Sequence, residues 1–376
     1  MSARPDFTVE YLKPLEAEPL PDEFSPSRLR RSLLVLAAIV LVVVAGLVLV
    51  PGLGSLRENF GGAQPGWLAL AAVLELGSCA GYVVAFRGVF CRRMSWRTST
   101  EIGLSELAAN SVFSIGGAGG LALGAWILRR GGLAADFIAR RTVAFFLLTS
   151  LANVSFLAIG GLALAAGLLS GSQGVLLGLI PAVVAALAIA LVLATRQLAG
   201  VLARRSMRAR LVAAASAAAD GVDEALRLLR ARDPAILLGA SGYLLFDVAM
   251  LGVCFAAFGN DVPPIAVLLV AYIIGQLGSL IPIPGGIGGV DAGLIGTLVL
   301  YGVDATDAAV AVIAYRGLLL TIPALLGLPA LAVLRRRLRD EAHDIAACAP
   351  GETVEVLGRG MVRQGAPGSA TASIGP

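Results

Sequence analysis

Charged residues are scarce in this sequence, since Asp, Glu, Lys and Arg together make up 14% of its 376 residues. A soluble domain usually carries about a quarter charged residues, so this chain has too few to cover a globule of its size. Hydrophobic residues make up 57% of the chain, and the mean hydropathy is +0.86. These values argue against a soluble protein and predict an integral membrane protein.

The sequence also has only one histidine and no pair of closely spaced cysteines. His343 is the only histidine and lies in a polar tail, which argues against a histidine-based active site or metal cluster. No CxxC pair occurs, so the sequence predicts neither a disulfide framework nor a zinc site. The four scattered cysteines are Cys79, Cys91, Cys254 and Cys348.

The two ends of the chain differ from its apolar centre. Residues 1–31 are polar and rich in acidic residues and proline, which predicts a disordered cytoplasmic tail without a cleavable signal peptide. Residues 338–376 are rich in Gly, Ala and Ser and too short for a catalytic domain, so we expect a second disordered cytoplasmic tail. Residues 32–337 between them are expected to form one membrane domain.

Six apolar runs are long enough to cross a membrane, which takes roughly 20 residues at 1.5 Å each. Two further stretches, 99–128 and 264–302, are apolar but broken near the middle by glycine clusters. The predicted fold is therefore an all-α polytopic membrane protein. The expected spans are about 32–52, 66–90, 142–168, 174–195, 234–258 and 309–335.

The arginines indicate how the broken stretches lie, because Lys and Arg concentrate in cytoplasmic loops. Both flanks of 99–128 carry arginines, whereas the short flanking segments of 264–302 carry no Lys or Arg. A single crossing cannot keep both flanks on one side, but a re-entrant helical hairpin can. The sequence thus predicts one hairpin entering from the cytoplasm and one from outside, with both termini cytoplasmic and Arg57 the only basic residue outside.

Each broken stretch follows a full span and precedes another. This is the pattern of an inverted-topology repeat, in which discontinuous helices meet near the midplane at a substrate site. A rival layout counts each broken stretch as one or two full crossings and leaves several arginines outside. Between the halves, the arginine-rich loop 196–233 has a helical middle that is expected either to lie on the inner membrane surface or to be a solvated connector.

The segment "LIPIPGGIGGVDAG" lies in the middle of the second broken stretch. Irregular backbone is tolerated at this depth only where protein or a water-filled cavity satisfies it. Proline lacks an amide hydrogen that would need a partner, and glycine permits left-handed backbone. A half-helix starting after this turn would direct free N–H groups toward an anion. The turn residues in question are Pro282, Pro284, Gly285, Gly286 and Gly288.

The corresponding segment of the first stretch is "SIGGAGGLALG", which contains Gly116 and Gly117. It formally fits a dinucleotide-binding fingerprint, but that motif needs a soluble βαβ unit, and the segment lies in a membrane stretch flanked by arginines. We therefore interpret it as a re-entrant turn. A packing face of small residues is the alternative.

Polar side chains inside the apolar runs are the strongest functional signal, because an ionisable one costs roughly 2.5–3.5 kcal/mol at a helix centre and needs a partner or a cavity. For Arg316, ligand binding and a structural ion pair with Asp247 or Asp291 are equally weighted. Asp291 is either a functional acid or a helix cap. The polar residues inside the apolar runs are Glu75, Glu106, Asn110, Asp247, Asp291 and Arg316.

Two late stretches resemble the lysylphosphatidylglycerol synthase transmembrane-domain family, also called the flippase-like domain family. "LIPIPGGIGGVDAGL" resembles the family's P-x-P-G-G-x-G-x-x-E segment, with Asp291 at the acidic position. "AYRGLLLTIPALLG" resembles the arginine-bearing last helix through Arg316 and Pro323. The resemblance covers roughly residues 32–337.

An early stretch, "AANSVFSIGGAGGLALGAWILRRGG", resembles the family's segment after the second span. Asn110 is kept, but Ser114, Gly116 and Gly117 replace the commoner proline and Gly-Glu pair. In two-part members, the family's membrane domain is thought to move aminoacylated phospholipid between leaflets, while a soluble synthase domain attaches the amino acid. The resemblance implies a stand-alone, transporter-like member, because no synthase domain is recognised here.

We therefore expect a multi-pass protein of the bacterial inner membrane that binds or translocates an amphipathic phospholipid, with an anionic head group, between leaflets. Arg316 and the two glycine turns would hold the phosphate, and Asp291, Asp247 and Glu106 would pair with Arg316 or with a cationic part of the head group. We expect no enzyme activity, cofactor, metal or nucleic acid. The alternative is a structural or assembly protein that anchors or regulates an envelope-lipid enzyme.

Overall fold

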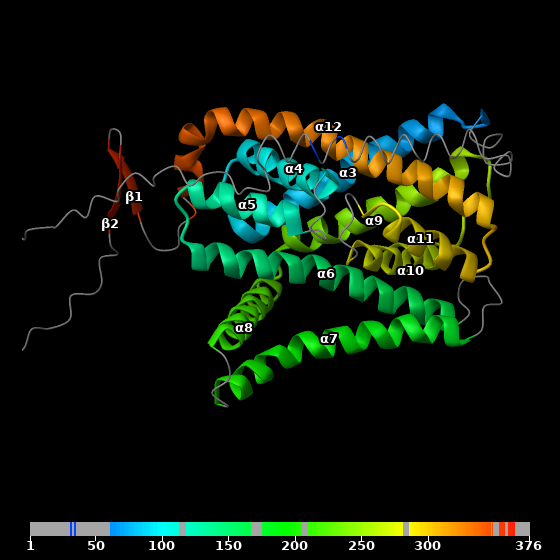
Figure 1. The fold of residues 1–376 in the computed structure, drawn as a ribbon, viewed down its shortest axis with the longest axis horizontal. Coiled ribbons are helices and arrows are strands. Elements are labelled where there is room, and N and C mark those ends of the chain that lie inside the picture. Colours follow the sequence, from blue (N-terminus) through cyan, green and yellow to red (C-terminus); the bar gives the residue numbers. More distant parts are fainter. Residues whose placement is uncertain are drawn as a thin grey trace, which may run out of the picture.

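The computed structural model describes residues 61–112, 118–166, 175–204, 209–280, 286–346, 353–357 and 360–364, with the single residues 31, 34 and 348. The described chain is almost entirely helical (Figure 1). All but one residue of the expected span 32–52 lie outside it. The helices are α3 (Pro65–Phe90), α4 (Trp96–Val112), α5 (Ala118–Arg130), α6 (Ala135–Ala165), α7 (Val175–Arg204), α8 (Ala209–Arg230), α9 (Pro234–Ala257), α10 (Ile265–Gln276), η3 (Leu277–Leu280), α11 (Gly289–Leu300) and α12 (Ala305–Ala346).

Four helices are long and apolar enough to cross a membrane: α3, α6, α9 and the Ala305–Arg337 part of α12. Helix α7 contains a shorter apolar segment, Gly178–Val192. Helices α10 and α11 have 12 residues each, which is about 18 Å of helix against a hydrocarbon core of about 30 Å. The chain is thus a helical membrane protein, while the number of crossings stays a prediction.

Both broken stretches form pairs of antiparallel helices. In the first pair, Glu106 of α4 lies against Gly124 of α5, and the Asn110 side chain accepts a hydrogen bond from the Gly120 N–H at 2.7 Å. In the second pair, α10 packs closely on α11, as predicted for a hairpin. The linking residues 113–117 and 281–285 lie outside the described structure.

Several contacts gather the arginine-bearing segments at one end of the helix bundle. Arg92, just after α3, pairs with Asp233, just before α9, at 2.6 Å. Arg141 near the start of α6 pairs with Glu224 of α8 at 2.9 Å and donates to the Val89 carbonyl of α3. The open side of the α4–α5 hairpin lies at this basic end, because the turn between α5 and α6 packs against the end of α12.

The opposite end of the bundle is acidic. The Gln64 N–H donates to the Ala257 carbonyl at 2.8 Å, which joins the start of α3 to the end of α9. Asp307, at the start of α12, lies within electrostatic reach of Asp261 in the loop before α10. The α10–α11 hairpin therefore opens at this end. The two helix pairs thus open at opposite ends of the bundle, and the re-entrant layout itself stays a prediction, as does the depth of these pairs in a membrane.

Two sets of helices have matching contacts. Helices α3 to α6 form the first set and α9 to α12 the second, and each set is a long helix, a hairpin and a long helix. Helix α3 packs along α9, α4 packs on α12, and α10 packs on α6. Helices α3 and α9 run antiparallel, because Gly81 meets Tyr243 and Gly88 meets Ile236. This is the arrangement expected of an inverted repeat.

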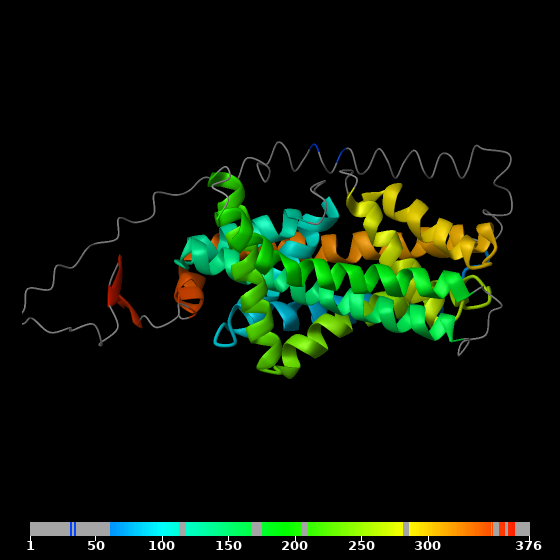
Figure 2. The ribbon, with the colours of Figure 1, turned by 90° about the horizontal axis from the view of Figure 1, so that it is seen from below.

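Helices α7 and α8 connect the two sets. Helix α7 lies at the edge of the bundle against α6, and α8 packs on α6 and α7 near the basic end (Figures 1 and 2). Hydrogen bonds from Arg227, together with the nearby Arg141, keep the pKa of the Glu224 carboxyl below its ordinary value. The predicted helical middle of loop 196–233 is thus α8, docked through Glu224.

A disulfide joins Cys91, which follows α3, to Cys348, which follows α12. The prediction that the cysteines form no disulfide framework is therefore wrong for this pair. The two residues are 257 positions apart, and they meet only because α12 returns to the end of α3. Their spacing gives no sign of that. Cys79 and Cys254 are free and buried.

Helix α12 extends beyond its apolar part, which ends at Arg337. The helix itself runs to Ala346. Strands β1 (Thr353–Leu357) and β2 (Gly360–Gln364) then form an antiparallel hairpin with Thr353 opposite Gln364. This hairpin stands apart from the helices in Figures 1 and 2. Both strands lie within the expected tail 338–376, whose disorder stays a prediction.

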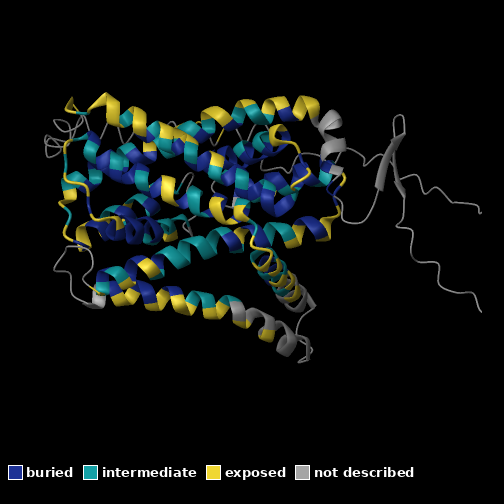
Figure 3. Cartoon of the chain, turned by 180° about the vertical axis from the view of Figure 1, so that it is seen from behind, coloured by how far each residue is buried: buried dark blue, intermediate teal, exposed yellow. Residues whose placement is uncertain are grey.

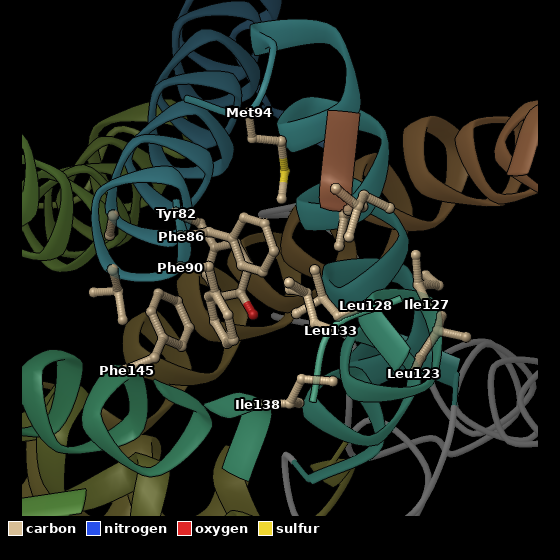
Figure 4. Close-up of a cluster of buried hydrophobic side chains, with 14 of the residues drawn as sticks. Tyr82, Phe86, Phe90, Met94, Leu123, Ile127, Leu128, Leu133, Ile138 and Phe145 are labelled. Carbon is tan, nitrogen blue, oxygen red and sulfur yellow. The ribbon is translucent and has the colours of Figure 1, made fainter. Parts of the chain in front are cut away.

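Buried residues concentrate in the middle helices, while the outer faces of α7 and α12 are exposed (Figure 3). Many of the exposed residues on these faces are large and apolar, among them Leu187, Leu191 and Leu325, which suits an environment that is itself apolar. One core cluster lies near the basic end and joins α3, α5 and α6 through residues that Figure 4 labels, including Phe86, Ile127 and Phe145. The second joins α9, α10, α11 and α12. This second core surrounds the candidate site.

Candidate functional site

The centre of the site is an ion pair between α12 and α11. Arg316 lies in the spanning part of α12 and is 7% exposed. Its Nε donates to Asp291 Oδ1 at 2.8 Å. A buried charge at this depth needs a partner, and of the two partners proposed from the sequence the structure shows Asp291. The structural ion pair is therefore present, and it does not exclude a second, ligand-binding role.

The start of α11 explains why Asp291 is in reach. Gly288 precedes the helix with φ +87° and Gly286 has φ +65°, backbone angles that favour glycine. Asp291 stands at the third helical position, where its Oδ2 accepts the Gly288 N–H at 2.7 Å. Asp291 is thus both a helix cap and the partner of Arg316. Arg316 Nη2 also lies close to Gly286, where an added Cβ would approach it to 3.6 Å.

Asp247 belongs to a neighbouring polar cluster on α9. It is 1% exposed, and its Oδ2 accepts a hydrogen bond from the Tyr272 hydroxyl of α10 at 2.6 Å. Tyr315, fully buried beside Arg316 in the sequence, lies within electrostatic reach of Asp247. The predicted pairing of Asp247 with Arg316 is replaced by a hydrogen bond to tyrosine.

Glu106 and Asn110 hold the first hairpin together. Glu106 is 1% exposed, and its Oε2 accepts a hydrogen bond from the Tyr82 hydroxyl at 2.7 Å. Its Oε1 occupies the place that a Cβ on Gly124 would take. These contacts tie α4 to α3 and α5, so Glu106 pairs with Tyr82 here and not with Arg316.

The predicted site residues therefore fall into separate groups. Arg316, Asp291, Gly286 and Gly288 come together at the start of α11. Asp247 lies in the tyrosine cluster, and Glu106 and Asn110 lie in the first hairpin. The remaining predicted residues, Gly116, Gly117, Pro282, Pro284 and Gly285, lie outside the described residues.

Sequence reasoning missed the tyrosines that complete these groups, Tyr82 and Tyr272. Each is buried, and each donates its hydroxyl to a buried carboxylate. A signal was available, because a tyrosine hydroxyl within an apolar helix needs a hydrogen-bond partner. Which carboxylate it meets depends on helix packing, which the sequence alone does not give.

A surface groove of about 320 Å³ runs between Trp67 and residues of α9 and α10, including Ala249 and Leu268. Its lining is almost wholly apolar and contains none of the predicted site residues. We assign the site from the buried charges, because the groove has no polar group to orient a head group. In the part of the chain that the structure describes, no three His, Cys, Asp or Glu side chains are grouped as a metal site.

Comparison with known proteins agrees with this architecture. The family model described as "Lysylphosphatidylglycerol synthase TM region" matches residues 35–327, which include α3 to α11, the first part of α12 and the Asp291–Arg316 pair. A search of curated proteins found no match. Because the match covers most of the chain and its membrane helices, the chain belongs to the lysylphosphatidylglycerol synthase TM region family.

Proposed function

We propose that this protein binds an amphipathic phospholipid with an anionic head group and moves it between membrane leaflets. The observation that carries the proposal is the buried Arg316–Asp291 pair at the start of a helix broken inside the apolar bundle. Guanidinium binds phosphate through two parallel hydrogen bonds, and the start of α11 adds a partial positive charge. Both features favour a phosphate group.

The Arg316–Asp291 ion pair supports a binding step in which a lipid replaces Asp291 as the partner of Arg316. A lipid phosphate that reached Arg316 would compete with Asp291 for the guanidinium. Asp291, which is less enclosed than Arg316 (24% against 8% exposed side chain), would then accept a cationic part of the head group. The family is named for an enzyme region whose product, lysylphosphatidylglycerol, carries both charges. The proposal contains no chemical step and needs no cofactor.

Two opposed hairpins within matching helix sets support the movement. In inverted repeats, rocking one half against the other exposes a midplane site alternately to each side. The basic end of the bundle is the cytoplasmic one in this proposal, because basic residues concentrate on the cytoplasmic side of membrane proteins. We place the protein in the bacterial inner membrane with both termini in the cytoplasm.

The test is lipid movement in proteoliposomes that contain phosphatidylglycerol labelled on its head group. Arg316→Leu should abolish protein-dependent movement. Arg316→Lys should largely do so, because an ammonium group lacks the planar fork that binds phosphate in two places. The matched control is Arg335→Leu, which removes an exposed arginine from the same helix and should leave movement unchanged. Full movement in folded Arg316→Leu would exclude this site and leave the assembly role as the better explanation.

A further inference from the structure

Two acidic side chains are buried where α3 packs along α9. Glu75 is 2% exposed and Asp247 is 1% exposed. Each retains a buried carboxyl oxygen without a hydrogen-bond partner among the described residues, Glu75 Oε2 and Asp247 Oδ1. Unpartnered carboxyl oxygens are costly in an apolar interior. The lipid site described above does not account for them.

The helix register brings the two carboxyl groups together. Gly77 of α3 meets Phe246 of α9, and Ser78 Oγ donates to the Tyr243 carbonyl at 3.1 Å. The helices are antiparallel, so Glu75 lies opposite Asp247, and the two charges act directly on each other. Helices α3 and α9 are also the first helices of the two matching sets. The carboxyl pair therefore lies at the interface that rocking of the repeats would change.

The groups that face this pair come from four helices. Cys79 of α3 has its Sγ 3.8 Å from Glu75 Oε1, and the Tyr272 hydroxyl of α10 donates to Asp247 at 2.6 Å. Tyr243 of α9 and Tyr315 of α12 lie within electrostatic reach of both carboxylates. The Tyr315 hydroxyl is buried and also lacks a partner within the described structure. The nearby Arg316 is engaged by Asp291.

Two adjacent carboxylates in a dry, apolar setting cannot both stay ionised, because each pays for desolvation and they repel each other. Within the described ranges, neither of them forms an ion pair with a basic side chain. A proton is the ligand that removes the charge without adding volume. Its uptake converts one carboxylate to a neutral acid and so removes the repulsion between the two.

We propose that Glu75 and Asp247 form a proton-binding site between the two repeats, and that proton uptake and release there drive the conformational cycle. The coupling part rests on the proposed lipid movement, whereas the proton site does not. The site is distinct from the Arg316–Asp291 pair, which lies on α11 and α12. A proton gradient across the membrane would then be the energy source for the cycle.

Infrared difference spectroscopy on a pH step tests the proton site without any lipid assay. The purified protein should show the carbonyl stretch of a protonated carboxyl group that disappears on alkalinisation. The Glu75→Gln/Asp247→Asn double variant should lose part of this signal, and in a Glu106→Gln background it should lose the rest, because the buried Glu106 carboxyl can give a band of the same kind. The matched control Asp136→Asn, which alters an exposed acid at the start of α6, should keep it. Absence of the signal in the native protein, or an undiminished signal in the double variant, would overturn the proton site.

Proteoliposomes with an imposed pH gradient test the coupling. Native protein should move labelled phosphatidylglycerol faster under one gradient direction than under the other, and Asp247→Asn should lose this dependence. Equal rates under both gradients would overturn the coupling. If native protein moves no lipid at any pH but retains the infrared signal, the proposed function fails while the proton site stands.

Discussion

Replacement of Asp291 by asparagine separates its two structural roles. Asparagine keeps a side-chain oxygen that can accept the Gly288 N–H, but it removes the charge that balances Arg316. Breaking a buried ion pair by removing one partner typically costs about 3–5 kcal/mol. Because the Asp291 side chain is 24% exposed, we expect the lower part of that range, about 3 kcal/mol.

The assay is equilibrium unfolding in detergent, followed by circular dichroism. The matched control is Asp304→Asn, because Asp304 caps α12 through the N–H groups of Thr306 and Asp307 at 2.7 and 3.3 Å and has no ion-pair partner among the described residues. That variant should be nearly as stable as the native protein, since Asn caps a helix about as well as Asp.

The single variant Arg316→Gln and the double variant Asp291→Asn/Arg316→Gln complete a double-mutant cycle. The double variant removes the uncompensated charge, so it should be more stable than Asp291→Asn alone. If Asp291→Asn proves no less stable than Asp304→Asn, then Asp291 acts only as a cap and Arg316 is balanced by another group. That result would refute the reasoning on which the site is built.

Three further perturbations test the fold. Reducing the Cys91–Cys348 disulfide should lower the free energy of unfolding by about 2–4 kcal/mol, measured as a shift of the thermal midpoint. Cytosolic disulfides are rare. Labelling of free thiols in intact cells will therefore also test whether the basic end is cytoplasmic. Gly124→Ala should lower the free energy of unfolding by about 1–3 kcal/mol, because the added Cβ overlaps the Glu106 carboxylate. An unchanged thermal midpoint would contradict the described packing. The pKa of Glu224 is held below its ordinary value of 4.5, so its charge supports α8 docking at neutral pH and is lost as pH falls through that lowered value. The protection of the α8 amides, which is hydrogen exchange corrected for its intrinsic pH dependence, should therefore be high at pH 7 and fall in acid. Glu224→Gln should remove this pH dependence of the protection.

The helical membrane fold could be read from the sequence because it depends on composition and run length. The glycine clusters located the breaks between α4 and α5 and between α10 and α11, since glycine and proline act locally on the backbone. The arginines predicted which segments gather at the basic end, because each cluster of arginines is visible within a short stretch of sequence. Each of these signals lies within a short segment of chain.

Side-chain partners were harder to predict, because they depend on packing between distant helices. Arg316 had two candidate partners in the sequence, and only the position of α11 beside α12 selects Asp291. Glu106 and Asp247 were expected near Arg316, but tyrosines from α3 and α10 meet them instead. The Cys91–Cys348 disulfide likewise depends on the path of α12.

The most direct test of the account is a map of the protein in nanodiscs that contain phosphatidylglycerol. The account places a head-group phosphate beside Arg316, between α11 and α12, with the Arg316–Asp291 bond lengthened or broken. Phosphate density confined to the two membrane surfaces, with the ion pair intact at every lipid concentration, would contradict the assignment of this pair as a lipid site.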